Sequence, residues 1–305
     1  MKLQPYIGRY APSPTGPLHM GSLIAAVASY CDARANNGKW LLRIEDIDET
    51  RCKPEYANDI ITTLHQFGFR WDGEISVQSH QKKRYETALE MLVKQQRVYA
   101  CRCSRKEIAD SMPILGVDGA VYPGTCRHLQ IAHQTNAIRL LTDNTIITFH
   151  DRVQGSQQQN IASDIGDFIV KRRDGLFAYQ LAVVVDDAQD SVTHVVRGAD
   201  LLDATPRQIY LQQLLGYATP SYLHIPVLVN AAGQKLSKQT LAPAINPTDA
   251  VAALITSLRY LRQSVVALQS SATLTPENVL KMAAKQWQPA LIASVRSQQI
   301  DDPQH

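Results

Sequence analysis

The sequence predicts an α/β fold, because short apolar strands alternate with helical segments along the chain. Near the start, the apolar segments 6–10 and 40–45 are typical of buried strands. Between them, segment 23–35 is rich in small and apolar residues and favours a helix, which completes a β-α-β unit. Apolar segments rich in β-branched residues return at 181–185 and 192–196, and we interpret both as further strands.

Helical patterns follow these strands and are punctuated by proline and glycine. They are predicted at five further places: 54–67, 80–97, 206–215, 247–261 and 276–295. Thr205 followed by Pro206 is typical of a helix start, and Gly68 and Gly216 are typical of helix ends.

The segment 99–178 differs in character, and we interpret it as an insertion. It carries three of the five cysteines and strand-like runs at 137–141 and 145–150. The polar stretch 154–160 is most simply a solvated hairpin or loop. We therefore predict three regions: one α/β domain made of 1–98 and 179–245, the inserted α/β subdomain 99–178, and a short helical region at 246–305.

Composition sets few limits on function. The chain has 305 residues with 31 basic and 28 acidic side chains, a net charge of +3 that neither demands nor excludes a nucleic-acid partner. The N-terminus lacks an apolar signal core, and no stretch approaches the roughly 18 apolar residues that a membrane helix needs. A cytoplasmic location without a membrane partner is therefore expected. The clustered cysteines resemble metal ligands more than a disulfide framework.

Two short motifs, far apart in the sequence, indicate nucleotide chemistry. The first, RYAPSPTGPLHMGS at 9–22, is a proline-rich loop that leads into the first predicted helix, whose N-terminus can hold a phosphate. The second, KLSKQ at 235–239, follows a strand-like stretch at 222–229 and a turn at Gly233. It puts two lysines and a hydroxyl on a loop that suits a polyphosphate.

The first motif resembles the first signature of class I aminoacyl-tRNA synthetases of the glutamate type, and the second motif resembles their second signature. Ser22 stands where the wider class has a histidine, as it does in glutamate enzymes. Similarity extends to three further segments: 43–48, 167–187 and 197–207. The resemblance implies a Rossmann-like class I synthetase catalytic domain whose substrates are L-glutamate and ATP, with Mg.

The resemblance assigns the activation chemistry to four residues: His19, Gly21, Lys235 and Lys238. Attack of a carboxylate on the α-phosphate of ATP builds negative charge on phosphate oxygens, so catalysis needs positioning and donors aimed at that charge. His19, the backbone near Gly21 and Lys238 would face ATP and supply such donors. Taken alone, His19 is more simply a loop histidine and the lysines a solvated turn. The two motifs together favour the ATP site.

The resemblance also implies a glutamate pocket of six residues: Arg9, Ala11, Ser13, Glu45, Tyr179 and Arg197. Arg9 would grip the side-chain carboxylate with two hydrogen bonds, helped by the Tyr179 hydroxyl. Arg197 would face the α-carboxylate. Glu45, with polar groups around Ala11 and Ser13, would face the α-ammonium group. Without the resemblance, a solvated strand end would be the simpler interpretation of Glu45, and a half-buried core aromatic that of Tyr179.

Only 66 residues follow Gln239, fewer than the helical anticodon-binding region of a full glutamyl-tRNA synthetase needs. The sequence therefore most resembles the truncated paralogues of these enzymes. Those paralogues activate glutamate and attach it to the queuosine base at the wobble position of the tRNA(Asp) anticodon loop. The alternatives are a truncated glutamyl-tRNA synthetase, a ligase that activates glutamate for another acceptor, and a non-catalytic RNA-binding paralogue.

Three cysteines in the insertion are typical of a zinc site. Cys101, Cys103 and Cys126 lie within 26 positions, and a tetrahedral zinc ion needs four donors brought together by loops. The truncated paralogues use a tyrosine four residues before the last cysteine, here Tyr122. Full-length zinc-bearing relatives use a histidine two residues after it, here His128. We favour Tyr122 and one structural zinc ion; reduced cysteines without a metal are the alternative.

Contacts with RNA are the least visible feature of the sequence. Candidate phosphate contacts are the basic residues at 105–106, 171–173 and 207 and the terminal helices of the stem-contact region 246–305, although each basic run is more simply a solvated face. The resemblance implies that a flipped-out anticodon-loop base enters the cleft that receives the acceptor end in full-length enzymes. Asp186 and Asp187 would border that opening.

Overall fold

The computed structural model describes residues 5–111, 114–117, 119–230, 233–236, 243–266 and 274–299. Its centre is a seven-stranded sheet in the order β3-β2-β1-β11-β12-β8-β9. The strands are β1 (Ile7–Tyr10), β2 (Lys39–Ile44), β3 (Ser76–Val77), β8 (Ile146–Asp151), β9 (Gly155–Asn160), β11 (His194–Gly198) and β12 (Ser221–Ile225). All neighbouring pairs are parallel except the β8–β9 hairpin. The predicted α/β class is confirmed.

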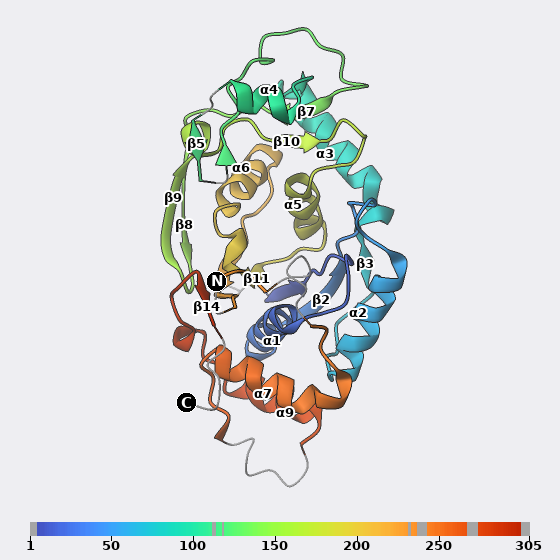
Figure 1. Cartoon of the computed structure of the whole chain (residues 1–305), viewed down its shortest axis with the longest axis vertical. Helices are drawn as coiled ribbons and strands as arrows, with labels where there is room; N and C mark the ends of the chain where they lie inside the picture. The colour runs from blue at the N-terminus through green and yellow to red at the C-terminus, as the bar shows by residue number, and fades with distance from the viewer. Residues whose placement is uncertain are drawn as a thin grey trace.

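Three helices lie on one side of this sheet: α1 (Met20–Ala35), α7 (Ala250–Tyr260) and α9 (Pro276–Lys285) (Figure 1). α1 packs on β1, and the two C-terminal helices pack on α1. A single apolar core joins them to the sheet and includes Leu23, Trp40, Leu254 and Leu280. The C-terminal helices thus share a core with the first motif's helix.

Three other helices build a second core: α3 (Lys82–Lys94), α5 (Tyr179–Gln189) and α6 (Thr205–Leu215). The predicted strand at 181–185 is wrong, because this segment lies inside α5, where all five side chains are buried. A short, continuous apolar run fits a helix that is buried on most sides as well as it fits a strand. Periodicity therefore did not distinguish them.

The range 99–178 contributes to two different sheets. Its β4 (Val98–Cys101), β7 (Ala137–Leu140) and β10 (Ile169–Lys171) form a separate three-stranded sheet with β7 in the middle and antiparallel pairing. Figure 1 shows this sheet with α4 (Arg105–Asp110) at the end of the molecule away from α7 and α9. The β8–β9 hairpin instead extends the main sheet. Of the two alternatives predicted for the polar stretch 154–160, a hairpin or a loop, the structure shows the hairpin, because 155–160 form β9. The bounds of the insertion stay a prediction.

Helix ends follow their sequence signals in most places. α2 (Pro54–Gln66) is followed by Gly68 at a φ of 83°, and α6 by Gly216 at a φ of 70°, a left-handed conformation that glycine adopts readily. α9 is shorter than predicted and ends at Lys285, because Pro289 cannot continue an α-helix. Among the described residues, no helix combines the length and apolar character that spanning a bilayer requires.

Candidate active site

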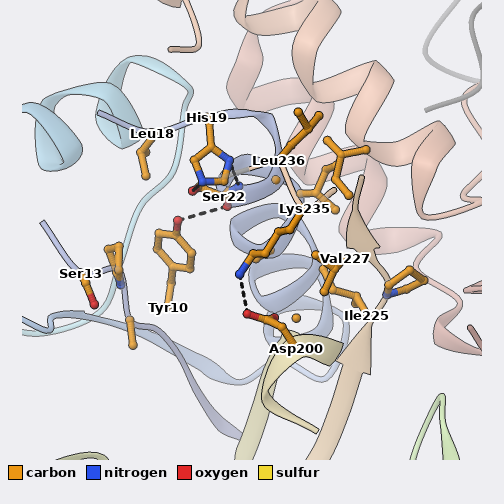
Figure 2. Close-up of a pocket in the computed structure, with 18 of the residues that line it drawn as sticks. Tyr10, Ser13, Leu18, His19, Ser22, Asp200, Ile225, Val227, Lys235 and Leu236 are labelled. Atoms are coloured by element: carbon orange, nitrogen blue, oxygen red, sulfur yellow. Dashed lines mark hydrogen bonds and ion pairs between the residues drawn. The ribbon is translucent and has the colours of Figure 1, made fainter. Parts of the chain in front are cut away.

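A cavity of about 430 Å³ lies at the carboxyl ends of three neighbouring strands, β1, β11 and β12 (Figure 2). Ligands of α/β proteins commonly bind at this edge of the sheet. Residues of both sequence motifs and of the segments after β11 and β12 line it, among them Tyr10, Ala11, Ser13, His19, Gly21, Asp200 and Lys235. The fold therefore brings the two motifs to one cavity.

His19 caps the first turn of α1 at the cavity wall. Its Nδ1 accepts a hydrogen bond from the Ser22 backbone N–H at 3.3 Å, and the Ser22 hydroxyl lies 3.1 Å from its Nε2. Because α1 begins at Met20, the first backbone amides of the helix lie here, where anions are favoured. Gly21 leaves room for the imidazole, since a β-carbon at this position would lie 3.2 Å from the His19 ring.

The second motif reaches the cavity through a short hairpin after β13 (Val227–Leu228). Gly233 adopts a φ of 74° in the turn, and the Leu236 N–H donates back to the Leu228 carbonyl at 2.8 Å. Lys235 then forms an ion pair with Asp200, with 2.5 Å between Nζ and Oδ2 (Figure 2). Lys238, the other predicted lysine, lies outside the described residues.

Arg9 is buried in a network of charges. Its Nε donates to Asp187 Oδ1 at 3.1 Å. Arg43 donates to the same oxygen at 2.6 Å and to Glu45 Oε1 at 3.3 Å. Burial acts to raise the pKa of Asp187, but Arg9 and Arg43 outweigh it and hold the pKa below its usual range. Among the described residues the hydrogen bonds of Arg9 use Nε alone, which leaves its terminal nitrogens for a ligand.

Asp186 and Asp187 do not border an opening, which corrects the interpretation of both. They lie on α5 and are buried, Asp186 completely. Asp186 accepts hydrogen bonds from the Tyr85 hydroxyl at 2.7 Å and from the Gln78 amide at 2.9 Å. Both aspartates therefore belong to the interior, where Asp187 holds Arg9.

The Tyr179 hydroxyl shares an electrostatic environment with the other charged residues of the predicted glutamate pocket. Burial raises the pKa of Tyr179, and Glu45 raises it further, whereas Arg197 and Arg9 act to lower it. The pKa of Glu45 itself is raised by burial, which outweighs the effect of the nearby arginines. Four side chains that are widely separated in sequence therefore lie within electrostatic reach of one another.

Arg197 is fixed by residues that sequence reasoning missed. Its Nε donates to His224 Nε2 at 3.0 Å, and its Nη2 donates to the Thr205 hydroxyl at 2.8 Å. His224 Nδ1 lies 2.6 Å from Asp151 Oδ2. Neither His224 nor Asp151 belongs to a motif, and the one available signal was a histidine within an apolar strand. Among the described residues, Nη1 of Arg197 is buried without a hydrogen-bond partner.

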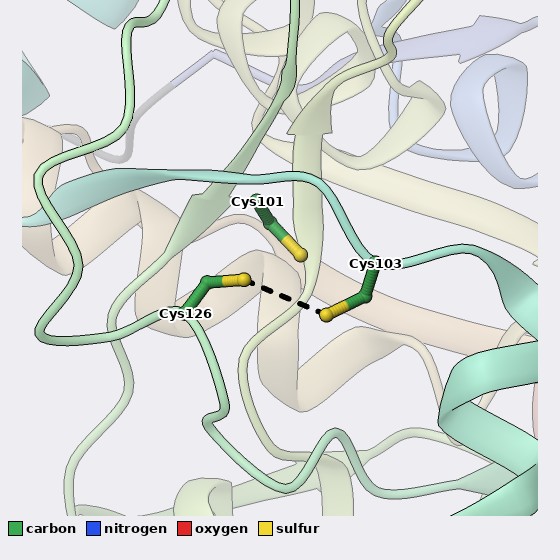
Figure 3. A group of neighbouring side chains, drawn as sticks. All are labelled: Cys101, Cys103 and Cys126. Atoms are coloured by element: carbon green, nitrogen blue, oxygen red, sulfur yellow. Dashed lines mark hydrogen bonds between the residues drawn. The ribbon is translucent and has the colours of Figure 1, made fainter.

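The three clustered cysteines lie together, as Figure 3 shows. The sulfurs of Cys101, Cys103 and Cys126 all lie within 4.8 Å of one another. The Tyr122 hydroxyl points into this group, 3.4 Å from Cys101 Sγ and 3.3 Å from Cys103 Sγ. His128 is exposed. Of the two predicted fourth ligands, only Tyr122 contacts the cluster.

The basic residues considered for RNA contact do not form one free surface. Arg207 is buried in the wall of a second cavity of about 530 Å³, which Arg105 and Arg139 also line. Arg172 donates to Asp174 at 2.6 Å. Positions 105–106 lie on α4, 171 ends β10 and 207 lies on α6, so these residues come from separate elements.

Comparisons with known proteins show the family to which the chain belongs. A family model described as tRNA synthetases class I (E and Q), catalytic domain, matches residues 7–254. The chain belongs to this class I synthetase family. The match spans all seven strands of the main sheet and all strands of the three-stranded sheet.

Similar proteins share one name and match this class I synthetase over most of their length. A protein of Acinetobacter baylyi named Glutamyl-Q tRNA(Asp) synthetase is 51% identical over 285 residues, which cover 93% of this chain and 92% of the relative. One of the same name from Dechloromonas aromatica is 54% identical over 263 residues, 86% of this chain and 87% of the relative. The predicted resemblance to the truncated paralogues is confirmed.

A solved structure supports the fold. The crystal structure of a glutamate tRNA ligase from Elizabethkingia meningosepticum CCUG26117, in complex with its amino acid, superposes with a TM-score of 0.79. It is 20% identical and covers 98% of this chain and 67% of that chain. The Rossmann-like arrangement predicted for a class I synthetase catalytic domain is therefore confirmed.

Proposed function

We propose that this class I synthetase activates L-glutamate with ATP to glutamyl-adenylate and transfers the glutamate to the queuosine base at the wobble position of tRNA(Asp). One observation carries the proposal: both nucleotide motifs meet in one cavity at the sheet edge where Arg9 and Arg197 also lie, on β1 and β11. The relatives named Glutamyl-Q tRNA(Asp) synthetase support the choice of acceptor.

The first motif and the lysine loop are proposed to bind ATP, with Mg. The amides at the start of α1 and the ring of His19 would hold phosphate oxygens, and Gly21 keeps that ring in place. Lys235 would exchange its partner Asp200 for a phosphate, and Lys238 would neutralise the charge that develops on the α-phosphate. In-line attack by the glutamate carboxylate on the α-phosphate would then break the α–β phosphoanhydride bond and release pyrophosphate, and it requires no covalent nucleophile from the protein.

Six residues are proposed to bind glutamate: Arg9, Ala11, Ser13, Glu45, Tyr179 and Arg197. The terminal nitrogens of Arg9, which make no hydrogen bond within the described part of the chain, suit the side-chain carboxylate, with the Tyr179 hydroxyl beside them. Nη1 of Arg197, which has no hydrogen-bond partner among the residues that the structure describes, suits the α-carboxylate. Glu45, together with Ala11 and Ser13 on the cavity wall, would accept the α-ammonium group. Aspartate is one methylene shorter, which alone is worth only about 1–3 kcal/mol, so the fixed position of Arg9 must strengthen the selection.

We further propose that Cys101, Cys103, Tyr122 and Cys126 hold one structural zinc ion. Three sulfurs and a phenol oxygen that converge at hydrogen-bond distances are a donor set that zinc accepts. Zinc would cross-link the loops of the insertion 99–178, and four protein ligands would leave no open position for catalysis. In this proposal the insertion receives the anticodon loop, and the helical region 246–305 contacts its stem.

The acceptor is proposed to be a single-stranded loop base, because a base without a partner can flip into a cavity. ATP and tRNA meet in the cytoplasm, which is therefore the expected place of action. The main competing function is a truncated glutamyl-tRNA synthetase that charges an acceptor end.

Pyrophosphate exchange tests the activation step. The protein is mixed with ATP, Mg and labelled pyrophosphate, without tRNA, and with glutamate, glutamine or aspartate in turn. We expect label in ATP with glutamate and far less with the other two amino acids. A folded protein that exchanges with none of them contradicts the proposed function.

A further inference from the structure

Three neighbouring strands place Arg197, His224 and Asp151 in one line across the sheet. Arg197 on β11 is the direct parallel partner of His224 on β12, so their side chains lie on the same face. Asp151 ends β8, the next strand, where it pairs with Tyr222 of β12. His224 and Asp151 are completely buried. The line joins Asp151, on the strand beside the edge strand β9, to a residue of the proposed glutamate pocket.

The hydrogen bonds in this line have one direction. A guanidinium nitrogen can only donate, so His224 Nε2, 3.0 Å from Arg197 Nε, must accept. The ring proton is then on Nδ1 and is donated to Asp151 Oδ2 at 2.6 Å. The opposite tautomer would point two N–H groups at each other, and a charged imidazolium would face the Arg197 cation.

Asp151 is itself held in one orientation. Its Oδ1 accepts three backbone N–H groups, those of Val153 at 3.0 Å, Gln154 at 2.8 Å and His224 at 3.2 Å. Oδ2 is therefore the oxygen that faces the imidazole. A carboxylate that is fixed in this way selects the ring tautomer of His224.

Two hydrogen bonds hold the guanidinium group of Arg197 in one orientation. His224 takes Nε and the Thr205 hydroxyl takes Nη2, at 3.0 and 2.8 Å. Nη1 remains, buried and without a hydrogen-bond partner in the part of the chain that the structure describes. An unpaired donor that is buried costs free energy unless a ligand satisfies it.

We propose that Asp151 and His224 are positioning residues. Asp151 fixes the tautomer of His224, and His224 in that tautomer holds Arg197 so that Nη1 faces the α-carboxylate of the bound glutamate. The proposal rests on the proposed glutamate-activating function. Burial, the stronger influence, and the nearby Arg197 lower the pKa of His224 to about 4, despite Asp151. A neutral imidazole at pH 7 agrees with the direction of the hydrogen bonds.

The tautomer can be measured directly in the wild-type protein. Long-range ¹H–¹⁵N correlation spectra of the histidine side chains at pH 7 distinguish Nδ1–H, Nε2–H and imidazolium forms. The His224 signals are assigned by their loss in His224→Gln. We expect the Nδ1–H form, and either of the other two would overturn the proposal.

Asp151→Asn tests the link to glutamate. The three backbone amides keep the side-chain oxygen of the new asparagine, so its NH₂ group faces His224. Because NH₂ can only donate, Nδ1 of His224 must accept and the ring proton moves to Nε2, as happens when the aspartate of a catalytic triad is changed to asparagine. We expect the KM for glutamate in pyrophosphate exchange to rise by about 10- to 100-fold, the effect of one lost hydrogen bond to a charged group. The KM for ATP should stay within about threefold.

Two further variants separate positioning from general destabilisation. Asp32→Asn changes another completely buried carboxylate, which accepts from Arg152 at 2.6 Å and from Trp287 at 2.9 Å, away from the cavity. It should lower stability without raising the glutamate KM. His224→Gln offers an acceptor to Arg197 and a donor to Asp151, and should keep more glutamate affinity than His224→Leu.

The outcomes distinguish this inference from the function on which it rests. Wild-type protein without glutamate-dependent exchange would overturn the proposed function, and with it the ligand assigned to Nη1. Exchange in the wild type, with an unchanged glutamate KM in folded Asp151→Asn, would overturn only the positioning role. If the KM for glutamate rises as much in Asp32→Asn as in Asp151→Asn, the positioning role is also overturned.

Discussion

At the scale of single residues, Asp187 determines how Arg9 can be used. The carboxylate occupies Nε at 3.1 Å and is shared with Arg43, so the guanidinium is held from the side and presents its terminal nitrogens. This arrangement is suited to end-on recognition of a second carboxylate. In the proposed pocket, Arg9 would contact the carboxylate of the substrate side chain, while Asp187 keeps the arginine in place through Nε.

The first prediction concerns Arg9→Ala, which removes the proposed partner of the glutamate side chain. Because two charge-assisted hydrogen bonds are lost, the KM for glutamate should rise by at least about 100-fold, with little change in the KM for ATP. Steady-state pyrophosphate exchange measures both constants. Arg51→Ala, at an exposed arginine, is the control. An unchanged dependence on glutamate in Arg9→Ala would show that the pocket assignment is wrong.

The second prediction concerns pH. The pKa of His224 is about 4 in the folded state and about 6.5 in the unfolded chain. Between these values the unfolded state binds more protons, so stability rises with pH and is lost as pH falls from about 6.5 towards 4. From pH 7 to pH 5, His224 should account for a loss on the order of 2 kcal/mol in the free energy of unfolding.

Urea denaturation at both pH values, with His224→Gln as the control, isolates this effect. The variant cannot titrate at this position, so its free energy of unfolding should fall less than that of the wild type over the same range. Equal losses in the two proteins would mean that His224 is not the buried neutral imidazole that the geometry requires.

At the scale of elements, the start of α1 depends on a residue without a side chain. A β-carbon on Gly21 would lie 3.2 Å from two atoms of the His19 ring, tighter than ordinary van der Waals contact, and 3.5 Å from the Leu236 carbonyl. Alanine would otherwise suit a helix better than glycine. The third prediction is therefore that Gly21→Ala keeps or slightly raises the melting temperature while adenylate formation slows by about tenfold or more, as expected when a catalytic donor is displaced.

Single-turnover adenylate formation and thermal unfolding of Gly21→Ala measure the two effects on the same sample. A variant with normal activity would show that the His19 ring does not need its present position. A variant that loses stability and activity together would point to general disruption of α1.

The fourth prediction concerns the proposed zinc site at Cys101, Cys103, Tyr122 and Cys126. Tyr122→Phe removes a donor that lies 3.3 Å from Cys103 Sγ, so zinc affinity should fall, whereas the exposed His128→Ala should leave it unchanged. A competition assay with a chromogenic chelator measures both affinities. The reverse order would make His128 the fourth ligand, and no bound zinc in any form would leave the cysteines without a metal.

The elements also show what the sequence can and cannot predict. Segment 6–10, helix α1 and the glycine ends of α2 and α6 were predictable, because each has a local signal that its environment does not override. The helix at 181–185 was not, because burial on most sides removes the periodicity that separates a helix from a strand. His224 and Asp151 were not predictable either: their role depends on strand order, which no local pattern encodes.

At the scale of the whole molecule, the chain is built around α1. The helix presents the first motif at its N-terminus and packs on the sheet and on α7 and α9. At its other end, Asp32 accepts hydrogen bonds from Arg152 of the β8–β9 hairpin and from Trp287 after α9. Segments from the beginning, middle and end of the chain therefore share one core with the proposed ATP site.

The measurement that tests the central claim most directly is the transfer of labelled glutamate to tRNA(Asp). The tRNA is prepared from cells that make queuosine and from cells that lack it, and is incubated with the protein, ATP and Mg. We predict label on the queuosine-containing tRNA alone, resistant to cleavage of the acceptor end. Equal labelling of both tRNAs, or label that leaves with the acceptor end, would contradict the account.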